Sequence, residues 1–94
     1  MIKMIGSLLC PDCIECKQIL EDRHIEYEFI DINASMMNLK LFLSYRDTSP
    51  VFDKVKERGN VGIPLLIIGG ELIVNYRKYF GLPKEKTSCG IHGC

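Results

Sequence analysis

The stretch Leu8-Leu9-Cys10-Pro11-Asp12-Cys13 separates two cysteines by two residues, at a point where a strand is predicted to give way to a helix. A disulfide needs Cβ atoms about 3.8 Å apart, whereas side chains three positions apart inside a regular helix lie about 5 to 6 Å apart. A pair that can close must therefore straddle the start of the helix. Cys10 and Cys13 meet this condition, and Cys13 and Cys16 do not.

The position of Cys10 at the predicted helix start favours its thiolate, because unpaired backbone N–H groups and the helix dipole stabilise an anion there. Cys10 is therefore the predicted nucleophile, although the carboxylate of Asp12 partly opposes this effect. Cys13, one turn further and more buried, is expected to keep its proton until it resolves a mixed disulfide by attacking Cys10.

Length and composition indicate one domain without a bulk electrostatic preference. The chain has 94 residues, with 12 lysines and arginines against 12 aspartates and glutamates, so it has no general attraction to nucleic acid or to an anionic membrane. No segment approaches the length of a membrane span or a signal peptide, which predicts a cytoplasmic protein. In that compartment, five cysteines favour catalysis or metal binding over structural disulfides. No large apolar patch is expected outside the site, which favours a monomer.

The order of elements is predicted to be β-α-β-α-α-β-β. Apolar periodicity, caps and turn residues place strands over residues 2–7, 27–32, 65–68 and 71–74, and helices over residues 11–24, 36–46 and 49–58. Gly6 and Ser7 are expected to loosen the chain ahead of the motif. Gly69-Gly70 predicts a hairpin, and residues 77–80 have room for one more helical turn. We expect a domain over residues 1–80 and a flexible, cysteine-containing tail over residues 81–94.

The motifs together resemble the glutaredoxin branch of the thioredoxin-like fold. They are Cys10-Pro11-Asp12-Cys13 after the first strand, Gly62-Ile63-Pro64 before the third, and the Gly-Gly hairpin. A further pattern, similar to that of small bacterial glutaredoxin-related proteins, is formed by Leu39, Phe42, Leu43, Arg46 and Asp47. The resemblance covers about residues 1 to 76. It implies an α/β fold with a four-stranded mixed sheet and flanking helices, and a thiol-disulfide oxidoreductase that reduces protein or glutathione mixed disulfides.

The resemblance also implies the substrate site. Pro64 would be cis and face the cysteines, and the backbone of Ile63 would hold the substrate. The expected catalytic residues are Cys10 and Cys13, and the expected substrate-binding residues are Pro11, Ile63, Pro64, Asn75 and Arg77. Glutathione is a possible co-substrate, for which Lys56 or Arg58 would meet the glycyl carboxylate. The implied partners are a disulfide-containing protein or glutathione, and the implied electron donor is a reductase or glutathione. The resemblance implies no resident cofactor and no metal.

Two features depart from the glutathione-using members. Leu8 and Leu9 replace a basic residue that those members carry upstream of the motif. In addition, Val74-Asn75-Tyr76-Arg77 replaces a Gly-Gly-x-Asp type turn, which there caps the γ-glutamyl carboxylate. Asn75 and Arg77 are expected to substitute in part for that turn.

Other residues leave alternatives open. Cys16 extends the motif toward an iron-sulfur pattern, but the fourth ligand is absent, and an inert packed thiol is the simpler interpretation. Cys89, His92 and Cys94 could bind zinc or copper(I), alone or with Cys10 and Cys13; they could also relay electrons, or be exposed tail residues. The alternative functions are therefore metal binding or delivery, and a binding module without turnover. His24 is expected to be solvated at a helix end, and Met36 and Met37 are expected in the core.

Overall fold

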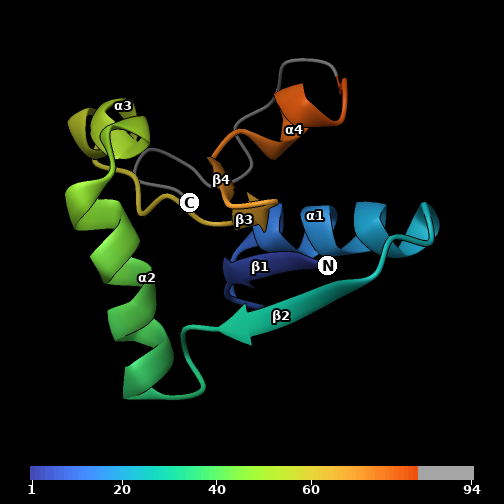
Figure 1. Cartoon of the computed structure of the whole chain (residues 1–94), viewed down its shortest axis with the longest axis horizontal. Helices are drawn as coiled ribbons and strands as arrows, with labels where there is room; N and C mark the ends of the chain where they lie inside the picture. The colour runs from blue at the N-terminus through green and yellow to red at the C-terminus, as the bar shows by residue number, and fades with distance from the viewer. Residues whose placement is uncertain (83–94) are drawn as a thin grey trace.

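The predicted order of helices and strands is confirmed in the computed structural model, which describes residues 1–82. The strands are β1 (Ile2–Gly6), β2 (Tyr27–Asp31), β3 (Leu65–Ile68) and β4 (Glu71–Ile73). The helices are α1 (Pro11–Asp22), α2 (Met36–Thr48), α3 (Asp53–Glu57) and α4 (Tyr76–Tyr79), and a 3₁₀ turn η1 (Pro50–Phe52) leads into α3 (Figure 1). The single helix predicted over residues 49–58 is thus divided into η1 and α3. Most of the predicted tail lies outside the described residues.

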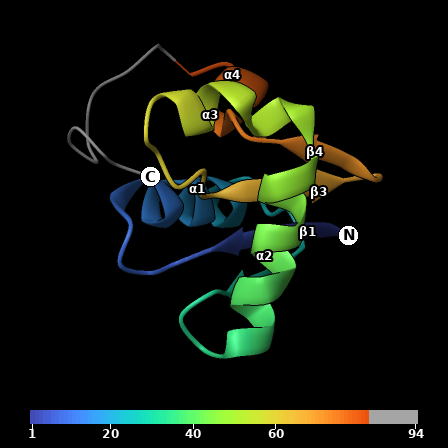
Figure 2. The same cartoon turned by 90° about the vertical axis from the view of Figure 1, so that its left-hand side faces the viewer.

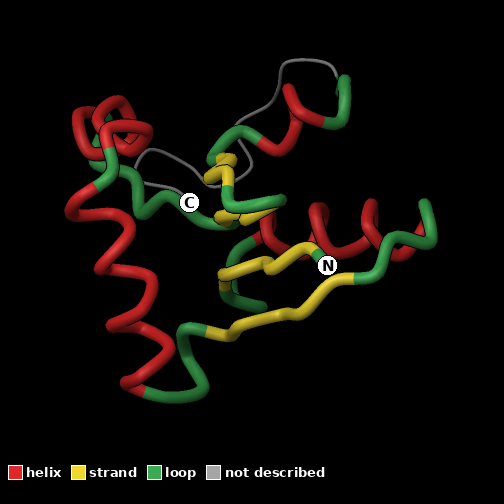
Figure 3. Tube along the Cα trace, viewed as in Figure 1, coloured by secondary structure: helices red, strands yellow, loops and turns green. Residues whose placement is uncertain are grey.

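The four strands form one mixed sheet in the order β2-β1-β3-β4 (Figure 3). β1 and β2 are parallel, with Ile2 opposite Tyr27, as expected when a helix connects two neighbouring strands. β3 runs antiparallel to both β1 and β4. The predicted hairpin between β3 and β4 is confirmed, and Gly69 and Gly70 have φ angles of 58° and 84°, which suit glycine.

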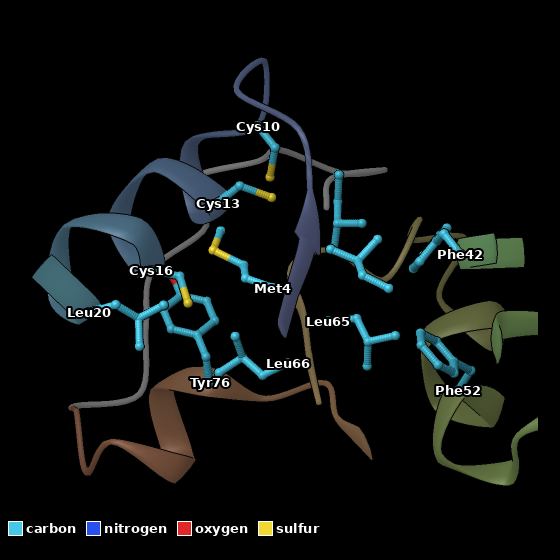
Figure 4. Packing of buried hydrophobic residues seen from close by; sticks show 12 residues of the cluster. Met4, Cys10, Cys13, Cys16, Leu20, Phe42, Phe52, Leu65, Leu66 and Tyr76 are labelled. Carbon is cyan, nitrogen blue, oxygen red and sulfur yellow. The ribbon is translucent and has the colours of Figure 1, made fainter. Parts of the chain in front are cut away.

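The helices cover both faces of the sheet. Figure 2 shows α2 and α3 in front of the strands and α1 behind them. Successive side chains of a strand point to opposite faces, and two core layers result (Figure 4). Met4 of β1 lies on the side of α1, and Leu65 of β3 lies toward Phe42 and Phe52. The rings of Phe42 and Phe52 meet edge to face, with centroids 6.0 Å apart.

Local signals explain where the longer helices begin and end. Pro11 occupies the first turn of α1, a position that suits its fixed φ. At the other end of α1, His24 has a φ of 58° and is exposed, which confirms the solvated position predicted for it. Its neighbour Ile25 donates its N–H to the carbonyl of Leu20 at 2.9 Å, which closes the helix end. Ser35 caps α2 by accepting the N–H of Asn38 at 3.1 Å.

The prediction that Met36 and Met37 belong to the core is wrong. Their side chains are 66% and 75% exposed, and Phe42 is the buried residue of α2. A helix turns about 100° per residue, so Met36 and Met37 project about 120° and 140° away from the direction of Phe42. The run of apolar residues along α2 is wider than the face that the sheet can cover.

Within residues 1–82, every helix is too short or too polar to cross a membrane.

We predict that Phe52→Ala lowers the free energy of unfolding by about 3 to 5 kcal/mol, because the fully buried ring leaves a cavity against Phe42. Met37→Ala, which removes an exposed side chain, is the control and should change it by less than about 0.5 kcal/mol. Urea unfolding of both variants measures the two values. Equal losses in the two variants would contradict the two-layer core described here.

Candidate active site

The two cysteines of the motif lie on either side of the helix start, as predicted. Cys10 is the N-cap residue of α1, with extended backbone angles, and its carbonyl accepts the N–H of Ile14 at 3.1 Å. Cys13 lies one turn inside α1 and is fully buried, whereas Cys10 is 5% exposed. Figure 4 shows the side chains of Cys10 and Cys13 pointing toward one another. Both residues of the motif are therefore buried, and Cys10 keeps slightly more exposed surface than Cys13.

The predicted cis peptide bond between Ile63 and Pro64 is confirmed. Pro64 is fully buried and precedes β3, the neighbour of β1 in the sheet. A Cβ atom built on Gly6 would lie 2.6 Å from the sulfur of Cys13 and 3.8 Å from Cα of Pro64. Cys13 and Pro64 therefore flank the same point of β1, and the cis peptide lies beside the cysteines.

The environment of Cys13 favours the protonated form of its thiol. Burial raises its pKa to about 11, and the carboxylates of Asp12 and Asp31 act in the same direction. The N–H of Ser7 donates to its sulfur at 3.4 Å and offsets part of this rise. The expectation that Gly6 and Ser7 loosen the chain is wrong, because both residues are buried beside Cys13.

Cys16 has the properties of an inert packed thiol. It is a free, fully buried thiol whose pKa is raised to about 12, mainly by burial. Among residues 1–82, the side chains of histidine, cysteine, aspartate and glutamate form no group of three that could hold a metal ion. The metal site considered for Cys89, His92 and Cys94 involves residues outside the described part of the chain and stays a prediction.

A cavity of about 710 Å³ opens beside the cis peptide, a size typical of small-molecule sites. Its wall combines the loop before β3 with the start of α1, residues of η1 and α3, and the start of α4. The lining residues are Asp12, Pro50, Val51, Asp53, Lys54, Val55, Arg58, Asn60, Gly62, Ile63, Pro64, Val74, Asn75, Tyr76 and Arg77. Three cationic and two anionic side chains thus face a ligand bound there.

Most of the predicted substrate-binding residues meet at this cavity. Ile63, Pro64, Asn75 and Arg77 line it, whereas Pro11 is exposed at the start of α1 and does not. Arg58 lines the cavity and Lys56 does not.

Sequence reasoning missed Lys54, which shares the cavity wall with Arg58. The two residues are four positions apart, and on a helix this spacing places them on one face, whereas Lys56 points elsewhere. Helical spacing could therefore have identified the pair.

A polar bridge holds α4 against α1. The carboxylate of Glu15 accepts a hydrogen bond from the hydroxyl of Tyr76 and forms an ion pair with Arg77. Burial, followed by the bond to Glu15, raises the pKa of the Tyr76 hydroxyl and keeps it protonated. The side chain of Asn75 accepts the N–H of Lys78 at 3.1 Å and caps α4. Asn75 and Arg77 therefore have structural partners as well as places in the cavity wall.

Two comparisons with known proteins agree with this arrangement. The family model described as Glutaredoxin matches residues 2–73, which include both motif cysteines and the cis peptide. An uncharacterized protein of Haemophilus influenzae is 34% identical over 70 residues, which are 73% of this chain and 81% of that protein.

We predict that Gly6→Ala destabilises the protein by about 1 to 3 kcal/mol, because the new methyl group would overlap the sulfur of Cys13. In a Cys13→Ala background the nearest remaining atom is Cβ of residue 13, at 3.5 Å, which is an ordinary contact. The same substitution should therefore cost little there. A double-mutant cycle of unfolding free energies measures the coupling. Equal costs in the two backgrounds would show that the sulfur of Cys13 does not set the spacing.

Proposed function

Since the chain belongs to the glutaredoxin family, we propose that it reduces protein disulfides or glutathione mixed disulfides with the dithiol of Cys10 and Cys13. The observation that carries this proposal is the arrangement of the motif. Cys10 is the N-cap residue of α1, Cys13 lies one turn inside the helix with a raised pKa, and the cis peptide of Pro64 lies beside them.

The proposed cycle transfers two electrons from the dithiol to the substrate. The Cys10 thiolate attacks one sulfur of the substrate disulfide, whose bond breaks as the first thiol leaves with a proton. Cys13 then loses its proton and attacks Cys10, which releases the second substrate thiol and forms the Cys10–Cys13 disulfide. A thiol reductant, either glutathione or a reductase, returns this disulfide to the dithiol.

The backbone of Ile63 is suited to hold an extended substrate segment. Among the hydrogen bonds within residues 1–82, none engages its N–H or carbonyl group. Backbone groups without an internal partner are available to pair with an added strand.

Leu8 and Leu9 are 51% and 83% exposed immediately before Cys10. This apolar rim suits a protein substrate better than it suits a charged peptide.

The cavity offers charges for the carboxylates of glutathione. Lys54 and Arg58 lie on the wall that α3 and its C-terminal end provide, and Arg77 lies on the wall that α4 provides. Glutathione has a carboxylate at each end, and cations at separate parts of the wall can meet both ends. We therefore include glutathione mixed disulfides in the proposal.

The assignment of the two thiols is tested with a disulfide-bonded peptide and a glutathionylated peptide. Cys10→Ser should abolish reduction of both, because the nucleophile is removed. Cys13→Ser should trap a mixed disulfide on Cys10 and slow reduction of the disulfide-bonded peptide at least a hundredfold.

In the wild type, the resolving step should accelerate about tenfold per pH unit from pH 7 toward the Cys13 pKa of about 11, as the thiolate fraction rises.

Mass spectrometry of quenched reactions measures the trapped species. Cys16→Ala serves as the control and should retain turnover, since Cys16 is buried away from the substrate. Turnover by Cys10→Ser would contradict the proposed mechanism.

The glutathione site is tested with three cations around α3. Lys54→Ala and Arg58→Ala should each raise KM for the glutathionylated peptide about two- to fivefold, the usual effect of an exposed ion pair. The value of kcat should stay within twofold, because neither side chain is near the sulfur atoms in the proposed arrangement. Lys56→Ala is the matched control and should change neither constant, since Lys56 is absent from the cavity wall. An equal rise in KM for all three variants would point to a general charge effect instead.

A further inference from the structure

Ser7 is the buried polar residue of the described chain, and all of its hydrogen-bonding groups are engaged. Its hydroxyl donates to the side-chain carbonyl of Asn33 and accepts the N–H of Leu9 at 3.0 Å. Its own N–H donates to the sulfur of Cys13 at 3.4 Å, and its carbonyl accepts the N–H of Cys10 at 3.2 Å. One residue therefore contacts the segments that hold both sulfur atoms.

The partner of the Ser7 hydroxyl is itself fixed to the sheet. The N–H of Asn33 donates to the carboxylate of Asp31 at 2.8 Å, and the N–H of Ile32 donates to the carbonyl of Gly6 at 2.9 Å. The loop after β2 is thus anchored to the end of β1. Residues 7–10 lead into the motif, and the bond between Ser7 and Asn33 holds them to this anchored loop.

We propose that Ser7, through its hydroxyl bond to Asn33, is a positioning residue that aligns the sulfur of Cys10 for attack by Cys13. The inference rests on the proposed function and concerns its resolving step. In that step Cys13 gives its proton to water, and its sulfur forms a bond to the sulfur of Cys10. The bond between Cys10 and the substrate breaks, and the substrate thiolate leaves with the electron pair and takes up a proton.

The two steps of the reaction depend on this alignment to different degrees. The first step needs only an accessible Cys10, because the substrate can adjust its approach. In the second step both sulfur atoms belong to the same chain, and a displacement of about 1 Å can slow such a reaction about a hundredfold. Ser7→Ala keeps the backbone N–H that faces Cys13 and removes only the hydroxyl. This substitution therefore isolates the link to Asn33.

The two steps can be measured separately with the symmetrical disulfide of thionitrobenzoate. The chain of residues 1–94 with Cys89→Ser and Cys94→Ser is the parent, so that these two cysteines do not contribute. Attack by Cys10 releases one coloured thionitrobenzoate anion, and attack by Cys13 on the resulting mixed disulfide releases a second. Ser7→Ala should leave the rate of the first release within about twofold and slow the second at least tenfold.

Four further variants make the result specific. Asn33→Ala removes the same bond from an exposed loop and should also slow the second release. The double variant should be no slower than the slower single variant, because both substitutions break one link. Ser7→Thr keeps the hydroxyl and should recover at least part of the rate. Ser44→Ala, which removes a hydroxyl bonded to the carbonyl of Leu41 on the exposed side of α2, should change neither release.

The outcomes separate the inference from the function on which it rests. A parent that releases only one equivalent would overturn both the dithiol function and the role of Ser7. A parent that releases two equivalents, together with Ser7→Ala and Asn33→Ala variants that resolve at the parental rate, would overturn the role of Ser7 alone. Equal slowing of both releases would also overturn it, because a general loosening of the site would then explain the effect. If Ser7→Ala fails to fold, Asn33→Ala decides between these outcomes.

Discussion

The close approach of Cys13 to the end of β1 is the contact on which the site depends. Gly6 leaves room for the sulfur of Cys13, which a Cβ atom at that position would meet at 2.6 Å. The same residue pairs with Asp31 in the parallel ladder to β2 and lies beside Pro64. The absence of one methyl group thus allows α1 and the cis-proline loop to pack against one strand end. This packing excludes water from Cys13, and burial is the main reason for its raised pKa.

Burial gives the two sulfur atoms of the motif different roles. Cys13 has no exposed surface and two carboxylates act on it, and both effects raise the pKa of its thiol. Cys10 ends its strand-to-helix connection at the first turn of α1, where backbone N–H groups favour an anion. The asymmetry arises from a difference of one helical turn in depth. Under the proposed function, this difference in burial is enough to distinguish the nucleophile from the resolving thiol.

The elements of the fold could largely be predicted from sequence, because their signals are local. Pro11 at the start of α1, Ser35 as the cap of α2 and Gly69-Gly70 in the hairpin each act on neighbouring residues. The direction in which a helix packs is not a local property, and the burial expected for Met36 and Met37 failed for this reason.

The positions of Cys10 and Cys13 at the helix start were predicted from residue types and spacing, and the cis bond before Pro64 was predicted from the family resemblance. Ser7 was misjudged because its partners Cys13 and Asn33 are brought together only by the sheet. A small polar residue between a strand and a helix looks the same in the sequence whether it lies in a loose connection or is buried and hydrogen-bonded. Only tertiary structure distinguishes the two cases.

The distribution of charge around the cavity bears on the substrate. At the α4 wall, the guanidinium of Arg77 is paired with Glu15, and Asp12 lines the same cavity. Lys54 and Arg58 share the opposite wall with the single carboxylate of Asp53. The cation at the α4 wall is therefore more fully compensated than those near α3, and an incoming carboxylate gains less there. Under the proposed function, the wall near α3 therefore contributes more than the α4 wall to the binding of a glutathione carboxylate.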